Sequence, residues 1–399
     1  MAIVFDSDAG TITGISVGGL PDGTVDNDTV ASGLASSKLT GALPAISAAS
    51  LTNVPKDTTV GGRKNMVING AMQVAQRGTS QAGYTAGGYY TCDRWFHDKD
   101  GSTGTFTMTQ EADAPDGFKN SLKVNCTTAG SSGAYNAIQT RLESQDTAHL
   151  AYGTSSAKAI TLSFWVKVSQ TGNQQMNLIH HADAGSRMIS FVYTINQANT
   201  WEKKTVTFAG DTTRVGDDDN TIGFYLEWFL SSYSGRTGSA VQTSWGAYTN
   251  TARFEGATIS IGDSTSDTWQ ITGVQLEVGS TATDFEGRSY GEELALCQRY
   301  FQILQDNAGY FAGNAVGSNR IDTGIPLAVP LRATPSFKAN GYLTHRSGNA
   351  NSSANQATVG SYNANSTILK IRFGGHSVTD EVAYVISITS EDLLIDSEL

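Results

Sequence analysis

The sequence predicts an all-β protein in four parts: an extended, trimeric N-terminal segment (1–62), a jelly-roll β-sandwich (63–287), a short linking helix (288–305) and a C-terminal β-sandwich-like domain (306–399). Three observations support this prediction. Apolar and polar residues alternate over many short segments, as is typical of half-buried strands. Glycine-rich polar runs separate these segments, and the chain holds 43 glycines in 399 residues. Aromatic side chains are nearly absent from the first 62 residues.

The N-terminal segment consists mainly of small and polar residues, and Phe5 is its only aromatic residue. So little apolar area could hardly offset the conformational entropy that the segment would lose by folding alone. Two interpretations fit this composition: a flexible linker, or a thin fibre that buries apolar area only when several chains wind together. Small apolar residues recur along the segment and favour the fibre. Pro44 and Pro55 exclude one long helix.

The predicted jelly roll rests on period-two alternation in two segments above all. In 161–168 the apolar residues alternate with Ser163, Trp165 and Lys167, and in 223–230 they alternate with Tyr225, Glu227 and Phe229. Many short strands with turn-rich loops between them indicate a sandwich or a barrel, of which the jelly roll is the common large version. We expect further strands over 188–195, 204–208, 254–261 and 269–278.

One helix is predicted, directly after the jelly roll. Ser289 and Glu292 have the spacing of a capping box, in which each side chain satisfies the other residue's backbone amide. Leu294, Cys297, Phe301 and Leu304 follow at helical spacing and would form its apolar stripe. After about residue 305 the pattern returns to strands, with alternation in 366–373 and 381–388.

Composition excludes several classes of protein. The chain has 37 acidic and 26 basic residues, a net charge of −11, which argues against binding nucleic acid. No apolar run approaches the roughly 20 residues of a membrane helix, so we expect no membrane insertion. The N-terminus lacks the pattern of a secretory signal. Cys92, Cys126 and Cys297 are far apart and odd in number, which indicates neither a disulfide framework nor a zinc site and fits synthesis in a reducing cytoplasm.

Several motifs resemble those of a domain found in phage tail-fibre and tail-spike proteins, a jelly roll of the carbohydrate-binding-module type. The motifs are 65–79, 93–95, 162–167, 201–208, 274–286 and the helical run 288–301, and the resemblance covers roughly 65–301. The earlier run 34–46 is similar to shaft segments of tail fibres. The resemblance implies a virion protein made in the host cytoplasm, a homotrimer that docks on tail or baseplate proteins through its N-terminal segment. It implies no catalytic residue and no cofactor.

Candidate ligand-binding residues come from aromatic and polar side chains on the same strand face. Sugars are held by rings that stack on their C–H faces and by amides and carboxylates that bind their hydroxyls. Trp165 with Lys167, and Tyr225 with Glu227, could form such a platform opposite the core. The alternative is that another sheet or a trimer partner covers these residues. In the C-terminal domain the mixed aromatic and cationic set consists of Tyr342, His345, Arg346, Tyr362 and His376, whose alternative is an ordinary surface or trimer interface.

Metal and catalytic sites are weakly indicated. Asp217, Asp218 and Asp219 form an acidic loop that could gather oxygen ligands for Ca²⁺, although a solvated turn is the simpler interpretation. His180 and His181 are adjacent, so on a strand they would point to opposite faces and could not easily share a metal ion. A glycosidase pair could be drawn from Glu143, Glu202, Glu227 and Glu277, but no hydrolase motif accompanies them, and we expect no enzyme.

Three functional hypotheses follow. The first is a tail fibre that binds host surface polysaccharide without cleaving it. The second is a structural fibre or adaptor that carries another receptor-binding protein. The third is a depolymerase tail spike, against which the absence of a short internal solenoid repeat argues.

Overall fold

The computed structural model describes residues 4–6, 11–13, 63–100, 104–130, 135–232, 235–305, 310–316, 320–339, 343–347, 350–354, 356–361, 368–374, 383–388 and 393–399. The chain divides into two units, Met1–Thr58 and Thr59–Leu399. In the first unit, β1 (Val4–Asp6) and β2 (Thr11–Thr13) form an antiparallel pair. The other residues of the predicted fibrous segment lie outside the described ones, so its extended, trimeric form stays a prediction, as do the domain boundaries.

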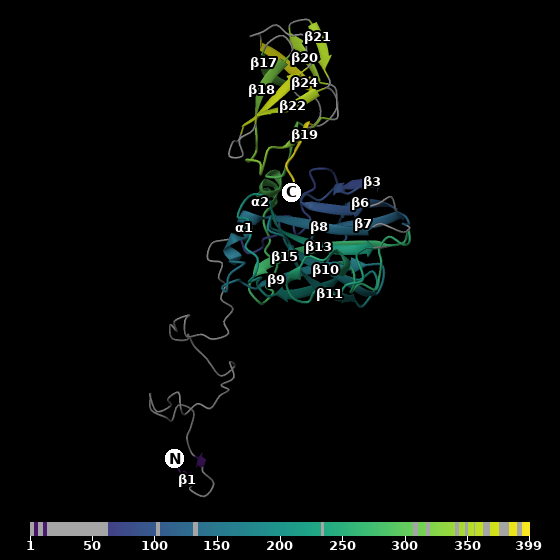
Figure 1. Cartoon of the computed structure of the whole chain (residues 1–399), viewed down its shortest axis with the longest axis vertical. Coiled ribbons are helices and arrows are strands. Elements are labelled where there is room, and N and C mark those ends of the chain that lie inside the picture. The colour runs from purple at the N-terminus through teal and green to yellow at the C-terminus, as the bar shows by residue number, and fades with distance from the viewer. Residues whose placement is uncertain are drawn as a thin grey trace. The chain divides into compact units, whose positions relative to one another are not determined.

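The second unit begins with a β-sandwich of two antiparallel sheets (Figure 1). The six-stranded sheet has the order β12 (Glu202–Phe208), β9 (Ile160–Val168), β15 (Thr268–Val278), β7 (Ser121–Thr128), β6 (Thr105–Glu111), β3 (Ser80–Tyr84). The seven-stranded sheet has the order β14 (Gly246–Ala247), β11 (Arg187–Ile195), β10 (Gly172–His180), β13 (Ile222–Ser232), β8 (Tyr135–Glu143), β5 (Trp95–Asp100), β4 (Gly88–Tyr89). The predicted all-β class is confirmed.

The core lies between the two sheets and is built from the residues that alternation predicts. The inward residues of β9 and β13 are almost completely buried: Leu162, Phe164, Val166, Val168, Phe224, Leu226, Trp228 and Leu230. Trp228 joins the layers, because its ring lies 5.6 Å from that of Trp95 in its own sheet and 5.5 Å from Phe164 in the other. Aromatic packing of this kind adds to the area that the sandwich buries. The cysteines 92, 126 and 297 are buried and unpaired.

The predicted strand over 254–261 is wrong. A short 3₁₀ turn, η4 (Asn250–Ala252), precedes an irregular segment that begins on the outer face of the seven-stranded sheet and ends with Ile259 and Ile261 in the core. Phe254 packs there on Phe229, with ring centroids 5.7 Å apart. The alternation of apolar residues in this segment therefore reflects packing on a sheet, not pairing within one. As a result, the outward-facing Glu227 and Phe229 are as buried as the core.

Two short helices accompany the sandwich, α1 (Ser144–Thr147) with the 3₁₀ turn η3 (Ala148–Leu150), and α2 (Tyr290–Gln298). The predicted capping box of α2 is confirmed, since Ser289 and Glu292 bond each other's backbone amides. Its predicted extension to 305 is wrong, because Phe301–Gln305 forms strand β16. Pairing of β16 with the distant β25 (Leu393–Asp396) overrides the local helical spacing. Neither helix in the described part of the chain is long and apolar enough to cross a membrane.

The C-terminal region contains two further antiparallel sheets. One has the order β16, β25, β19 (Ser336–Ala339). The other has the order β21 (Ala350–Ala354), β20 (Leu343–Ser347), β24 (Ala383–Ile388), β17 (Tyr310–Ala315), β18 (Arg320–Pro326), β23 (Ile368–Gly374), β22 (Gln356–Ser361). The strands predicted over 366–373 and 381–388 correspond to β23 and β24 and are confirmed.

Residues of the 65–79 and 93–95 motifs connect the start of the sandwich to residues that follow α2 and to the last residues of the C-terminal region. The Arg94 guanidinium lies 3.4 Å from the centre of the Tyr300 ring and bonds the Glu398 carboxylate. Arg77 stacks on the next ring, Phe301, at 3.7 Å. These arginines are buried or nearly so. The motif residues are therefore structural, as the resemblance implies.

Candidate functional site

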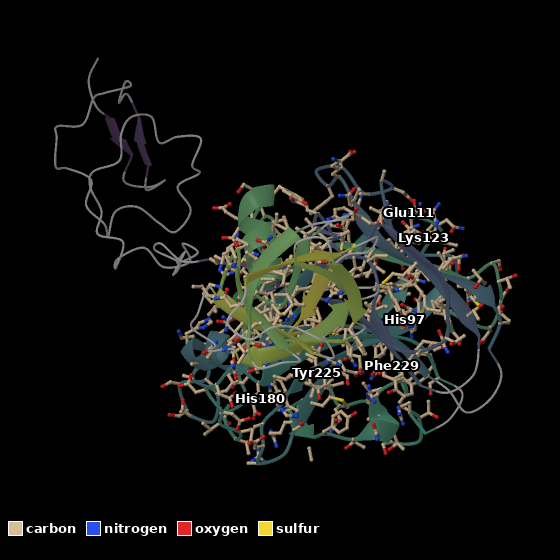
Figure 2. All side chains as sticks on the ribbon, turned by 90° about the horizontal axis from the view of Figure 1, so that it is seen from above. His97, Glu111, Lys123, His180, Tyr225 and Phe229 are labelled. Carbon is tan, nitrogen blue, oxygen red and sulfur yellow. The ribbon has the colours of Figure 1, made fainter. Side chains whose placement is uncertain are left out.

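The two predicted residue pairs lie on opposite sides of the sandwich. Trp165 and Lys167 are on the outer face of the six-stranded sheet, because β9 belongs to it, and Tyr225 and Glu227 are on the outer face of the seven-stranded sheet. Figure 2 shows Tyr225 on one side of the molecule and Lys123, from β7 of the six-stranded sheet, on the other. The four residues therefore do not form one platform.

The Trp165 side is engaged in contacts within the chain. Lys167 Nζ lies 2.7 Å from Asp113 Oδ2, and this contact lowers the pKa of the Asp113 carboxyl. Trp201 Nε1 donates to the other oxygen of Asp113 at 3.2 Å. Trp165 is partly buried against Gly273, where an added Cβ would come within 3.0 Å of its ring. This face is a packed polar surface.

Glu227 is fully buried, so it cannot contact a ligand. Its carboxylate is bonded on both oxygens by Arg253, which is 5% exposed; the Arg253 Nε–Glu227 Oε1 distance is 3.0 Å. Gln139 Nε2 donates to Oε2 at 2.9 Å and Asn177 Nδ2 to Oε1 at 3.0 Å. Glu227 therefore orients the amides and the guanidinium around it.

Above this network lies a row of side chains from three neighbouring strands, which we call the Tyr225 strip: Phe96 and Asp98 of β5, Gln139 and Arg141 of β8, and Tyr225 of β13. Four of them are partly exposed, and Gln139 is buried. Phe96 is paired with Gln139, and Arg141 with Tyr225, so all five point to the same face. The Arg141 guanidinium lies between two rings, 4.7 Å from the centre of Phe96 and 5.9 Å from that of Tyr225.

The polar groups of the strip are held in fixed orientations. Gln139 Nε2 donates to Asp98 Oδ2 at 2.8 Å as well as to Glu227, and Arg141 Nη2 donates to Gln139 Oε1 at 3.0 Å. Burial raises the pKa of Asp98, the Glu227 charge raises it further, and Arg253 opposes both. An amide that donates to two carboxylates and accepts from a guanidinium has no freedom to flip.

Further groups mark the ends of the strip. The ring of His181 lies 6.0 Å from that of Tyr225. At the other end, Arg141 Nη1 and the Tyr89 hydroxyl both donate to a main-chain oxygen of Leu399. The partly exposed members of the strip therefore combine flat rings, a guanidinium and a carboxylate on one sheet face, and the buried amide of Gln139 lies between them. Such a surface can stack on an apolar ring face and bond several hydroxyls at once.

Sequence reasoning found Tyr225 but missed the rest of the strip. Phe96 with Asp98, and Gln139 with Arg141, alternate with inward residues in the same way as Tyr225 with Glu227. That alternation was the available signal. It could not place these residues beside Tyr225, because the pairing of β5, β8 and β13 joins segments up to about 130 residues apart.

The carboxylates of the acidic loop have partners within the chain. Asp217 accepts from the amide of Asp183, and Asp219 accepts from the amide of Thr221. Within the described residues, no three His, Cys, Asp or Glu side chains are placed to hold a metal ion. The opposite orientation predicted for the two histidines is confirmed: His180 stacks on Phe224 inside the sandwich and His181 lies beside Tyr225 outside it.

The four glutamates considered for catalysis each have their own partners. Glu143 accepts from Arg299 and Tyr300, whose hydrogen bonds outweigh burial and hold its pKa below the usual range. Glu202 bonds Asn196 and Lys204, and Glu277 bonds Gln275 and Thr283.

The candidates of the C-terminal domain are not placed by the structure. Tyr342, Tyr362 and His376 lie outside the described residues. His345 and Arg346 belong to β20, whose backbone alone is described. All five stay predictions.

Comparison with known proteins gives no match to a protein family and no match among curated proteins. Among solved structures, the chain is similar to the enzymatically active domain of tailspike protein 4 of bacteriophage CBA120, with 14% identity and a TM-score of 0.31 over 54% of this chain and 21% of that one. The chain thus spans about a fifth of that tailspike domain.

Two further similar structures are smaller. A putative sugar binding protein from Bacteroides thetaiotaomicron aligns with 12% identity and a TM-score of 0.30 over 54% of this chain and all of that one. A family 11 carbohydrate-binding module from Clostridium thermocellum aligns with 12% identity and a TM-score of 0.26 over 47% of this chain and 90% of that one. The structural neighbours therefore include a phage tailspike domain and carbohydrate-binding modules.

Proposed function

We propose that this protein binds glycans without cleaving them and that the Tyr225 strip is the surface that contacts the sugar chain. One observation carries the proposal: the Arg141 guanidinium lies between the rings of Phe96 and Tyr225 on a sheet face that is only partly exposed. Planar groups arranged side by side fit a chain of sugar rings, which offers apolar faces and hydroxyl edges in alternation.

The buried layer below the strip supports the same function. Glu227 and Arg253 fix Gln139, and Gln139 fixes Asp98, so the hydroxyl-binding groups are oriented before a ligand arrives. Preorganisation reduces the entropy lost on binding.

The finer proposal is that the protein is a tail fibre of a phage virion, a homotrimer that docks on tail or baseplate proteins and adsorbs to host surface polysaccharide. The motifs of 65–301 and the fibre-like composition of 1–62 support it. Light scattering of the full chain should give three times the monomer mass of 42.2 kDa. A monomeric mass would contradict the trimer. It would not bear on glycan binding, which the polysaccharide experiment below tests separately.

The absence of catalysis is also proposed. The glutamates 143, 202, 227 and 277 are all bonded within the chain, which supports a binding rather than a hydrolytic role. Incubation with host polysaccharide should release no new reducing ends. Release of such ends would favour the depolymerase tail spike instead.

Binding to purified host surface polysaccharide tests the strip. Tyr225→Ala should abolish or strongly weaken retention of the full chain, and Tyr290→Ala is a matched control because Tyr290 is 57% exposed on α2, outside the strip. Equal binding by wild type and Tyr225→Ala would overturn the assignment of the site. Failure of the wild type to bind any host polysaccharide would favour the adaptor.

A further inference from the structure

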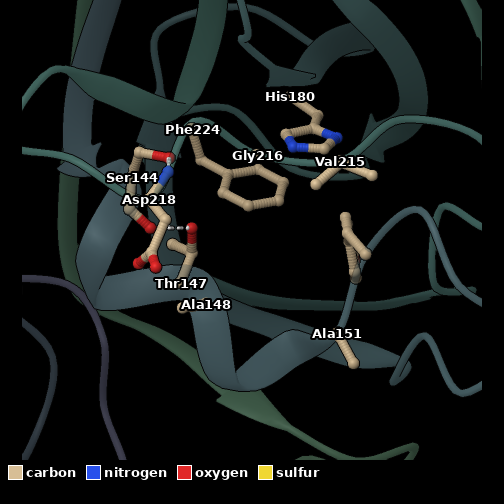
Figure 3. Close-up of a pocket in the computed structure, with 10 residues that line it drawn as sticks. Ser144, Thr147, Ala148, Ala151, His180, Val215, Gly216, Asp218 and Phe224 are labelled. Atoms are coloured by element: carbon tan, nitrogen blue, oxygen red, sulfur yellow. Dashed lines mark hydrogen bonds between the residues drawn. The ribbon is translucent and has the colours of Figure 1, made fainter.

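A pocket of about 190 Å³ opens between α1, the end of β10 and the loop that precedes β13 (Figure 3). It is separate from the Tyr225 strip, since Phe224 and His180 line the pocket from the inner face of the sheet whereas Tyr225 and His181 lie on the outer face. Nothing in the glycan-binding strip uses these residues.

Three rings form the apolar part of the pocket. The His180 and Phe224 rings are stacked, with centroids 4.8 Å apart and planes at 12°. Tyr152 meets both rings edge-on at 5.3 Å. Val215, also a lining residue, is 64% exposed, so an apolar side chain stands at the pocket's edge instead of being packed away.

His180 presents a hydrogen-bond acceptor. Its Nδ1 lies 3.3 Å from Asp211 Oδ2, and Arg187 Nε holds the same carboxylate at 3.0 Å. A carboxylate accepts, so Nδ1 carries the proton and Nε2 keeps its lone pair. Burial lowers the pKa of His180, although Asp211 opposes that shift, which is consistent with a neutral ring.

The wall beside this nitrogen has no side chain. A Cβ on Gly216 would lie 3.2 Å from Ser144 Oγ and 3.6 Å from His180 Nε2. The absence of a side chain at Gly216 therefore leaves space beside both polar atoms. Ser144 Oγ accepts from the amide of Asp218 at 3.0 Å, and Asp218 has a left-handed backbone (φ 52°). Asp218 is also one of the residues that line the pocket.

The Tyr152 hydroxyl is the clearest sign of a missing partner. Tyr152 is 7% exposed, and across the described residues its hydroxyl has no hydrogen-bond partner. A buried hydroxyl without a partner costs about 1–3 kcal/mol unless something bonds it. A ligand with a hydroxyl of its own would supply that bond.

We infer that this pocket binds a single neutral sugar ring, such as the terminal residue of a glycan, and this inference rests on the proposed function. The pocket is smaller than the roughly 300–1,000 Å³ that drug-sized ligands occupy, so it suits one ring. Asp218 and His180 Nε2 both accept hydrogen bonds and would disfavour an anion, whereas sugar hydroxyls donate to them. The rings and Val215 would contact the apolar face of the sugar.

The test measures binding of single neutral monosaccharides (glucose, galactose, mannose, rhamnose and N-acetylglucosamine) to the full chain by titration calorimetry and saturation-transfer NMR. At least one should bind, and Tyr152→Phe should weaken it about 3- to 10-fold, the worth of one hydrogen bond. The variant should melt no lower than wild type, because the lost hydroxyl has no partner in the free protein. Gly216→Ala should weaken monosaccharide binding further, because the added Cβ would occupy the space beside Ser144 Oγ and His180 Nε2.

Tyr225→Ala separates this inference from the proposed function. It should weaken retention on polysaccharide by about 30-fold in Kd and leave monosaccharide binding unchanged. No binding by any monosaccharide, or binding that Tyr225→Ala removes and Tyr152→Phe does not, would overturn the pocket and leave the strip intact. If Tyr225→Ala and Tyr152→Phe both bind polysaccharide as well as wild type does, that result would instead count against the strip.

Discussion

Arg253 and Glu227 form a two-pronged ion pair that is buried under a partly exposed sheet face, with Nε 3.0 Å from Oε1. Arg253 comes from the turn that follows η4, and Glu227 from the middle of β13. The pair therefore fastens an irregular covering segment to the sheet and at the same time orients the amide of Gln139.

Removing the arginine should leave an unpaired buried charge. We expect Arg253→Met to lower the free energy of unfolding by about 3–5 kcal/mol, measured by urea denaturation. The double variant Arg253→Met with Glu227→Gln should recover part of that loss, since the buried charge is gone. A single variant as stable as wild type would show that solvent reaches the site.

A change in Tyr225 should separate stacking from hydrogen bonding. Tyr225→Phe keeps the ring beside Arg141 and should retain most of the affinity for polysaccharide. Tyr225→Ala removes the ring and should cost about 2 kcal/mol, or roughly 30-fold in Kd. Surface plasmon resonance on immobilised polysaccharide compares the two. Equal losses would assign the contact to the hydroxyl.

Acid should destabilise the sandwich through His97. This ring is fully buried, and burial, with the Lys99 charge, lowers its pKa to about 3. The folded state thus leaves His97 neutral, whereas the unfolded chain protonates it near pH 6.5. The free energy of unfolding should therefore fall as the pH drops from about 6.5 towards 3, by at most about 1.4 kcal/mol per pH unit.

The variant His97→Asn tests whether His97 causes the loss of stability in acid. It keeps an acceptor near the Tyr84 hydroxyl, which bonds His97 Nδ1 at 2.6 Å, and it cannot titrate. Its stability should depend less on pH over the same window. Asp93 acts in the opposite direction: burial raises its pKa to about 6, so its contribution is present at low pH and is lost as the pH rises towards 6. An unchanged pH profile in His97→Asn would assign the acid sensitivity to other groups.

Two glycines should respond oppositely to alanine. A Cβ on Gly70 would lie 2.1 Å from the backbone carbonyl oxygen of Val274, so Gly70→Ala should cost about 1–3 kcal/mol or more. Gly291, within α2, has nothing within 4 Å, and Gly291→Ala should stabilise by about 0.5–1 kcal/mol. Thermal melts of both variants give the comparison. A tolerated Gly70→Ala would mean that the 65–79 motif is looser than its contacts indicate.

Local alternation predicted the strands and their inner faces. In β9 and β13 it separated the buried residues from Trp165 and Tyr225 correctly, because side-chain direction has a period of two in any strand. It could not assign these two strands to different sheets, since that depends on pairing between distant segments. For the same reason, helical spacing alone extends the predicted helix into β16. Alternation alone likewise predicts a strand over 254–261, where the structure has an irregular segment.

The candidate site shows the same division. Tyr225 was found because its own strand marks it as outward, whereas Arg141 and Phe96 join it only through the order of the sheet. The sequence predicts Glu227 as a ligand contact, yet Glu227 is buried beneath the irregular segment that follows η4, and local alternation cannot place that segment over it. The His180 pocket likewise depends on the meeting of α1, the end of β10 and the loop that precedes β13.

At the end of β10 and in β13, consecutive residues belong to different proposed sites. Phe224 and His180 face inward to the pocket, and their successors Tyr225 and His181 face outward to the strip. One sugar chain would have to turn around the sheet to reach both, so two separate chains are the natural occupants. Each copy would then be bivalent and able to cross-link neighbouring glycans, and a trimer would multiply weak contacts into firm adhesion through avidity.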